Sequence, residues 1–92
     1  MAKLGDEEIE ARLGALDGWE REGDAIAKKF DRGDFVGSVK LVDAIVGPAE
    51  EMGHHPDLAI SWSEVKVTIT THSEGGLTAA DFKLAGAIDE LA

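Results

Sequence analysis

The chain gathers its acid–base groups in one stretch, because its three histidines, His54, His55 and His72, all fall within nineteen residues. Imidazole is the one side chain whose ordinary pKa lets it both donate and accept a proton near neutral pH. The chain has no cysteine, which excludes a thiolate nucleophile and thiolate metal ligands. The pattern therefore predicts general acid–base catalysis around residues 53–56 and 70–72.

Length and composition restrict the classes of protein that fit. The 92 residues are enough for one domain, taken as residues 1–92, and so short a chain buries a thin core, so we expect self-association. Nineteen acidic residues against nine basic ones give a net charge of -10, which would repel a phosphate backbone. The N-terminus lacks the apolar region of a signal peptide, and no apolar run approaches the roughly 20 residues of a membrane helix. We expect a cytoplasmic protein that binds neither nucleic acid nor membrane.

Apolar periodicity and turn residues predict seven elements that must position the histidines, in the order α-β-β-α-β-β-α. Helices are expected over residues 7–16, 35–52 and 79–91, and strands over residues 19–21, 25–30, 58–62 and 65–71. The strands come in consecutive pairs, so the order lacks the strand–helix–strand alternation typical of a parallel sheet. The sequence therefore predicts an α+β fold, with a four-stranded antiparallel sheet and three helices packed on one face.

Capping signals stand at the ends of the predicted helices. Asp6 and Asp34 are predicted to cap the first two helices, and Gly53 is predicted to stop the second. Thr78 and Asp81 match a capping box for the last helix, so we interpret Asp81 as a cap and not as a catalytic acid.

The middle helix has an apolar stripe that we expect to face the core. The stripe consists of Phe35, Val39, Val42, Val46 and Ala49, with Ile45 and Met52 beside it. Pro48 interrupts it. Because proline inside a helix removes a backbone donor and costs about 3 kcal/mol, we expect a kink or a restart there.

In the second strand of the second hairpin, apolar and polar residues alternate, so Val65, Val67 and Ile69 should face the core. The same alternation puts His72 at the strand end, on the polar side. The turn is predicted at Ser63-Glu64, and the preceding tryptophan is interpreted as a core or interface aromatic.

One spacing resembles the signature of the pterin-4a-carbinolamine dehydratases. It consists of Glu50, His54-His55-Pro56 after three residues, Trp62 after five, His72 after nine and Asp81 after eight. The likeness runs from about Gly18 to the C-terminus. A lone His-His-Pro would be weak, but the joint spacing of both histidine sites, the aromatic residue and the final acid is specific.

The resemblance implies a lyase that dehydrates a 4a-hydroxytetrahydropterin to a quinonoid dihydropterin during pterin recycling. That substrate is made when an aromatic amino-acid hydroxylase turns over, so a functional link to such an enzyme is implied. No metal or bound cofactor is implied, because the pterin is the substrate. The resemblance also implies assembly into dimers or tetramers.

Roles for individual residues follow from the same resemblance. His54 and His72 are assigned to the acid–base pair and His55 mainly to holding the pterin. Further pterin contacts map onto Gly53, Thr70, Thr71 and Ser73. Glu50 lies one helical turn before His54, where it could orient a histidine.

Two other functions stay open. A non-catalytic dimerisation or protein-binding module of the same fold would use the helices and not the histidines, and animal members of the family also act as dimerisation partners of a transcription factor. A metal protein would use Glu50 with the three histidines. Adjacent histidines tend to point apart and the usual short-spaced ligand pairs are missing, so we predict no metal site.

Overall fold

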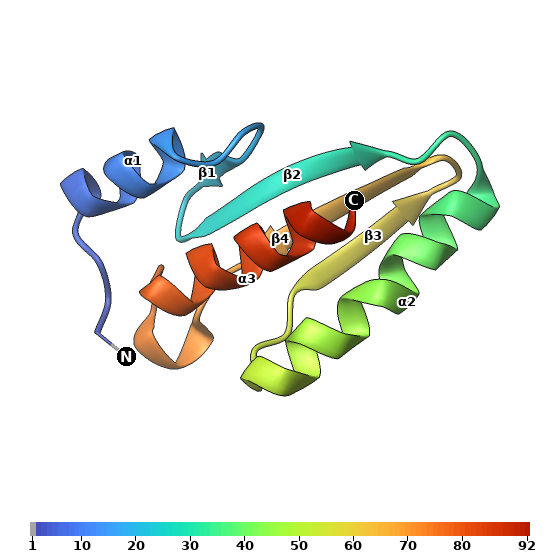
Figure 1. Ribbon diagram of the computed structural model, residues 1–92. Coiled ribbons are helices and arrows are strands. Elements are labelled where there is room, and N and C mark those ends of the chain that lie inside the picture. Colours follow the sequence, from blue (N-terminus) through green and yellow to red (C-terminus); the bar gives the residue numbers. More distant parts are fainter. Residues whose placement is uncertain (1) are drawn as a thin grey trace.

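The computed structural model describes residues 2–92 and confirms the predicted order of elements (Figure 1). The helices are α1 (Asp6–Gly14), α2 (Phe35–Met52) and α3 (Ala79–Leu91), with a 3₁₀ turn, η1 (His72–Glu74). The strands are β1 (Glu20–Glu22), β2 (Ala25–Asp31), β3 (Asp57–Ser61) and β4 (Glu64–Ile69). They form one sheet in the order β1-β2-β4-β3, with every neighbouring pair antiparallel. The expected α+β fold is therefore confirmed.

Strand β4 lies inside the sheet, between β2 and β3. Its alternation buries Val65, Val67 and Ile69 completely, as predicted. The strand ends two residues earlier than expected, because Thr71 pairs with Gly76 in an isolated bridge that closes the η1 turn. This early end is what brings the 70–73 segment out of the sheet and toward the start of α3.

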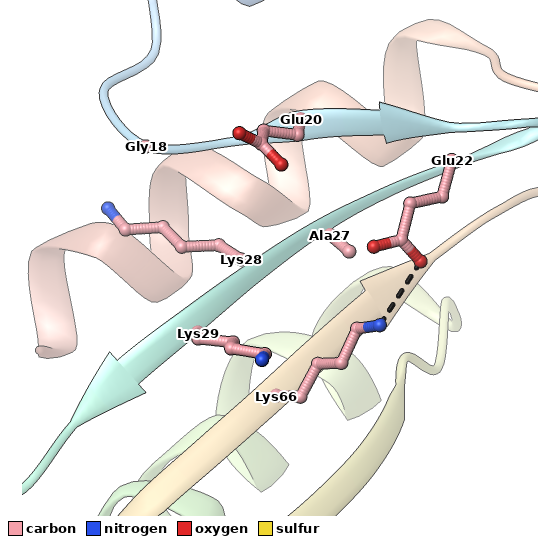
Figure 2. Close-up of a pocket in the computed structure, with 7 residues that line it drawn as sticks. All are labelled: Gly18, Glu20, Glu22, Ala27, Lys28, Lys29 and Lys66. Carbon is pink, nitrogen blue, oxygen red and sulfur yellow. Dashed lines mark hydrogen bonds and ion pairs between the residues drawn. The ribbon is translucent and has the colours of Figure 1, made fainter.

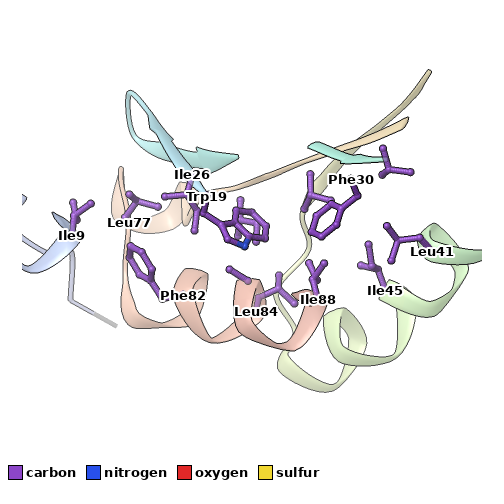
Figure 3. Packing of buried hydrophobic residues seen from close by; sticks show 14 residues of the cluster. Ile9, Trp19, Ile26, Phe30, Leu41, Ile45, Leu77, Phe82, Leu84 and Ile88 are labelled. Carbon is purple, nitrogen blue, oxygen red and sulfur yellow. The ribbon is translucent and has the colours of Figure 1, made fainter. Parts of the chain in front are cut away.

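The core lies between the sheet and the helices (Figure 3). Helix α2 packs against β3, β4 and α3, while α1 reaches the core through its one buried residue, Ile9. Trp19 packs edge-on against Phe30 with ring centroids 6.1 Å apart. The indole N–H of Trp19 donates to the Asp89 carboxylate at 3.0 Å, and Lys28 Nζ donates to the same carboxylate at 2.9 Å. These contacts fasten α3 to the first hairpin.

Helix α1 departs from the prediction at both ends. Asp6 is the first helical residue and not the N-cap, which is Gly5. The Asp6 carboxylate is engaged elsewhere, since it accepts a hydrogen bond from Arg21 Nη1 at 2.9 Å. The helix stops at Gly14, two residues earlier than expected.

Helix α2 has the predicted bounds, and Asp34 caps it by accepting from the Gly37 N–H at 2.7 Å. The helix passes through Pro48 as one element, so the expected restart is wrong. Proline leaves the carbonyl four residues earlier, that of Ala44, without its helical donor. Ala44 is exposed, so water can solvate that carbonyl and the helix continues.

The predicted core stripe of α2 is wrong for most of its members. The buried residues are Ser38, Leu41, Ile45 and Ala49. Phe35, Val39 and Val46 are 56%, 44% and 54% exposed. The helix carries two apolar stripes, and the buried one packs against β3, β4 and α3. The other stripe is left on the surface.

The β3–β4 turn also differs from the prediction, because it is formed by Trp62 and Ser63 while Glu64 opens β4. Trp62 has a φ of 51°, in the left-handed region that bulky residues rarely adopt. Its side chain is 74% exposed, so Trp62 is not a core aromatic, while its role as an interface aromatic stays a prediction.

Within residues 2–92, no helix combines the length and the apolar character needed to cross a membrane.

Candidate active site

Asp81 joins the two segments that carry the histidines. This residue lies in the first turn of α3 and is completely buried. One carboxylate oxygen, Oδ1, is 2.6 Å from His54 Nε2. The other, Oδ2, accepts hydrogen bonds from Thr71 Oγ1 and from the Thr78 N–H, both at 2.8 Å. A single carboxylate therefore holds the end of α2, the segment after β4 and the start of α3 together.

The two threonine hydroxyls around Asp81 form a directed chain. Each hydroxyl has one proton, and that of Thr71 goes to Asp81. The 3.0 Å contact between Thr71 Oγ1 and Thr78 Oγ1 must then use the Thr78 proton, while Thr78 Oγ1 accepts from the Ala80 N–H. This order completes the predicted capping box and leaves the carboxylate as acceptor in all of its contacts. A polar group so deeply buried needs this full set of partners.

The sequence around Gly53 explains how His54 reaches Asp81. Gly53 adopts a left-handed conformation with a φ of 60° and donates to the Glu50 carbonyl at 3.2 Å. The His54 N–H donates to the Ala49 carbonyl at 3.0 Å. This pair of bonds is a Schellman motif, which ends the helix as predicted and turns the chain toward α3.

The bond to Asp81 decides which nitrogen of His54 is available for chemistry. An ionised carboxylate can only accept, so Nε2 carries a proton when it binds Asp81. Nδ1 is then the nitrogen that exchanges a proton with another molecule. Asp81 is consequently more than the helix cap that the sequence predicted, since it also fixes the imidazole of His54.

His55 points to a different carboxylate. Its Nε2 lies 2.5 Å from Glu50 Oε2, and the two side chains are 64% and 67% exposed. The histidine next to Glu50 is thus His55. An apolar cavity of about 170 Å³ adjoins this pair, lined by Val42, Ile45, Val46, Ala49, Glu50, His55, Pro56 and Leu58.

The second segment is fixed by its threonines. Thr70 Oγ1 donates to the carbonyl of Asp24, in the loop of the first hairpin, while Thr71 is bound to Asp81. His72 and Ser73 follow in η1 and are exposed. Within residues 2–92 the His72 ring has no hydrogen-bond partner. It lies three residues beyond the end of β4 and not on the strand itself.

The predicted site residues therefore divide into two groups, and only one of them lies at the Asp81 carboxylate. His54 and Thr71 bind Asp81, and Gly53 and His72 are their neighbours in the chain. His55 and Glu50 form a separate, exposed pair. In the described part of the chain, no three histidine or acidic side chains converge as metal ligands.

A larger hollow of about 420 Å³ lies on the open face of the sheet (Figure 2). Its lining residues are Gly18, Glu20, Glu22, Ala27, Lys28, Lys29 and Lys66. Lys66 pairs with Glu22 at 3.2 Å, and Lys28 with Asp89 at 2.9 Å. This hollow is lined by no histidine, and two of its three lysines are closely paired with carboxylates. It is therefore a weaker candidate for acid–base chemistry than the surroundings of Asp81.

Known proteins resemble this chain over nearly its whole length. The sequence model of the family described as pterin 4 alpha carbinolamine dehydratase matches residues 2–91. A provisionally named pterin-4-alpha-carbinolamine dehydratase from Thermosynechococcus vestitus is 48% identical over 90 residues, which cover 98% of this chain and 95% of the relative.

Two solved structures share the fold. The crystal structure of a transcriptional coactivator/pterin dehydratase from Brucella melitensis superposes with a TM-score of 0.93 at 34% identity, covering 98% of both chains. A pterin dehydratase-like protein, described as a RuBisCO assembly factor in the alpha-carboxysome, gives a TM-score of 0.70 at 26% identity, covering 82% of this chain and 89% of the other.

Proposed function

We propose, because the chain belongs to the pterin 4 alpha carbinolamine dehydratase family, that it is a lyase converting a 4a-hydroxytetrahydropterin to a quinonoid dihydropterin. The observation that carries the proposal is the carboxylate of Asp81, which binds His54 through one oxygen and Thr71, the neighbour of His72, through the other. Two histidine-bearing segments that are distant in sequence are thereby held at one place.

The proposed reaction needs one acid and one base. The bond between carbon 4a and the hydroxyl oxygen breaks, and the hydroxyl leaves as water after it accepts a proton from the acid. The base removes the proton from nitrogen 5, whose electron pair forms the new double bond to carbon 4a. No electron acceptor or hydride carrier takes part. General acid–base help of this kind is typically worth about 10² to 10⁴ in rate.

We assign the two proton transfers to His54 and His72. Asp81 keeps His54 Nε2 occupied and fixes the ring, which leaves Nδ1 to exchange a proton with the substrate, so Asp81 acts as a positioning residue. The exposed His72 ring, free of protein partners within the described residues, is available to a bound molecule. The chemistry allows either histidine to be the acid.

Substrate binding is assigned to the residues beside these two. His55, whose ring is oriented by Glu50, is proposed to hold the pterin. The proposed further contacts are Gly53, Thr70, Thr71 and Ser73. A neutral bicyclic ring also suits a chain with a net charge of -10, which repels an anionic substrate.

The direct test adds the purified protein to freshly generated 4a-hydroxytetrahydropterin and follows the quinonoid product by absorbance. We expect a rate well above that of buffer and proportional to protein concentration. A rate equal to buffer, for a protein whose circular dichroism shows it folded, removes the proposed activity.

Self-association belongs to the same proposal. The exposed stripe of α2, with Phe35, Val39 and Val46, is large for the surface of so small a protein and suits burial against another copy as a dimer or tetramer. A cytoplasmic location and a functional link to an aromatic amino-acid hydroxylase are further proposals, and a hydroxylase encoded beside this protein would support the link.

The exposed stripe also favours a second candidate function, a protein-binding module. The Brucella melitensis structure is of a transcriptional coactivator/pterin dehydratase, and the alpha-carboxysome protein is a RuBisCO assembly factor. A module of this kind would bind its partner through α2 and would not need the histidines. A stoichiometric partner recovered from a pull-down, together with no dehydratase activity, would favour it.

A further inference from the structure

A third cavity, of about 450 Å³, lies between α1 and α3, and the histidines do not line it. Its lining residues are Arg12, Ala15, Leu16, Ala79, Phe82 and Lys83. Because successive residues of an α-helix are turned by roughly 100°, Phe82 and Lys83 project from α3 on a different side from Asp81. This cavity is therefore distinct from the proposed dehydratase site.

The wall of the α1–α3 cavity is aromatic and apolar. Phe82 is mostly buried, and Figure 3 shows it at the end of the core nearest Ile9 and Leu77, away from α2. The guanidinium carbon of Arg12 lies 6.0 Å from the centre of the Phe82 ring. A flat ring entering here can contact Phe82 and Leu16.

The rim of the cavity carries two cations without close acidic partners. Arg12 Nε is shielded from solvent and has no hydrogen-bond partner in the described chain; the Glu8 carboxylate is 3.8 Å away, too far for a hydrogen bond. Lys83 forms no ion pair within residues 2–92. By contrast, Arg21, Lys28 and Lys66 each lie within 3.2 Å of a carboxylate.

What distinguishes Arg12 and Lys83 is that both line one cavity with an apolar wall. An anion in the cavity would meet the exposed terminal nitrogens of the Arg12 guanidinium and the Lys83 ammonium. The volume of the cavity falls in the range of small-molecule sites, whereas a partner helix needs a longer groove.

We infer that the α1–α3 cavity binds a small aromatic monocarboxylate. Its ring lies against Phe82 and Leu16, and its carboxylate accepts from the terminal nitrogens of the Arg12 guanidinium and from Lys83 Nζ. The inference does not depend on the proposed dehydratase activity, because no residue is shared between the two sites.

The test uses phenylacetate as the probe and isothermal titration calorimetry at low, constant ionic strength on the full chain. We expect a dissociation constant of about 1 mM, in keeping with a ligand of this size. The neutral 2-phenylethanol should bind at least about tenfold more weakly, because it lacks the charge. Saturation-transfer NMR of the phenyl protons provides a second measure.

Variants locate the binding. Arg12→Gln and Lys83→Gln should each weaken phenylacetate binding by about tenfold, whereas Lys40→Gln, an equal change of charge at an exposed position on α2, should leave it unchanged. His72→Ala should also leave it unchanged. Lys83 is exposed, so its replacement tests the inference even where Arg12→Gln loosens α1.

Several results overturn the inference. One is that phenylacetate does not bind at a concentration tenfold above the expected dissociation constant, and another is that 2-phenylethanol binds equally well. The others are that Lys83→Gln binds phenylacetate as tightly as the wild type, or that His72→Ala loses the binding. The last result would place the ligand in the histidine site and would not affect the dehydratase proposal. Failure of the dehydratase assay, in turn, leaves this inference intact.

Discussion

His54 Nε2 lies 2.6 Å from Asp81 Oδ1, although 27 residues separate the two in the chain. The same Asp81 side chain accepts from the Thr78 N–H at the start of α3. One buried carboxylate thus stabilises a helix end and orients an imidazole. Stability and activity should therefore be linked at Asp81.

Replacing Asp81 by asparagine should lower kcat by about 10² while changing KM little. The amide keeps one acceptor oxygen, so either His54 or the Thr71 and Thr78 donors lose theirs. We also expect the free energy of unfolding to fall by about 1 to 3 kcal/mol. Steady-state kinetics and urea unfolding on the same preparation measure both effects.

The matched control for this change is Asp34→Ala, which removes the cap of α2 at the helix end far from His54. It should cost about 1 kcal/mol of stability with kcat within a factor of two of the wild type. If both variants lose the same share of activity, Asp81 acts on stability alone and its positioning role is wrong.

Helix boundaries could be predicted where a strong local pattern decides them. Asp34 at one end and Gly53 at the other fixed the limits of α2, and the Thr78–Asp81 capping box fixed the start of α3. The face of α2 that enters the core could not be predicted in this way, because both of its stripes are apolar. Periodicity alone does not tell which of the two the sheet covers.

The site was only partly contained in the sequence pattern. The spacing included Asp81, but a local capping box was enough to explain an acid at that position. The bond from Asp81 to His54 depends on how α2 and α3 pack, which the local sequence does not determine. Likewise, a glutamate one turn before two adjacent histidines is compatible with orienting either, and the fold pairs Glu50 with His55.

Glu50→Gln should raise KM severalfold and leave kcat nearly unchanged, because it removes the charge that orients His55. Both side chains are exposed, so the free energy of unfolding should change by less than about 0.5 kcal/mol. The neighbouring Glu51→Gln is the control, since Glu51 is also exposed and has no ion pair within residues 2–92. Equal KM values for the two variants would remove the role of Glu50.

Asp89→Asn should destabilise the fold by about 1 to 3 kcal/mol without affecting catalysis. The carboxylate accepts from Trp19 Nε1 at 3.0 Å and from Lys28 Nζ at 2.9 Å, and the amide weakens both interactions. Urea unfolding followed by tryptophan fluorescence gives the free energy, with the exposed Glu90→Gln as control. Unchanged stability would show that these contacts contribute little.

Val46→Glu should shift the protein to a monomer, raising the dissociation constant of the assembly by about 10² through a charge buried in an apolar contact. The fold should survive, because Val46 lies on the exposed stripe of α2. Light scattering coupled to gel filtration measures the mass. Ala44→Glu, on the other exposed side of the helix, should assemble as the wild type does. A monomeric wild type would contradict the proposed interface.

The central claim is that one place in the fold combines His54 and His72 for proton transfer. It is tested most directly by the rate of 4a-hydroxytetrahydropterin dehydration for the wild type, His54→Ala and His72→Ala, each checked for native circular dichroism. We predict that each single variant is slower by about 10² to 10⁴. A folded variant of either histidine that dehydrates the substrate at the wild-type rate would contradict the claim.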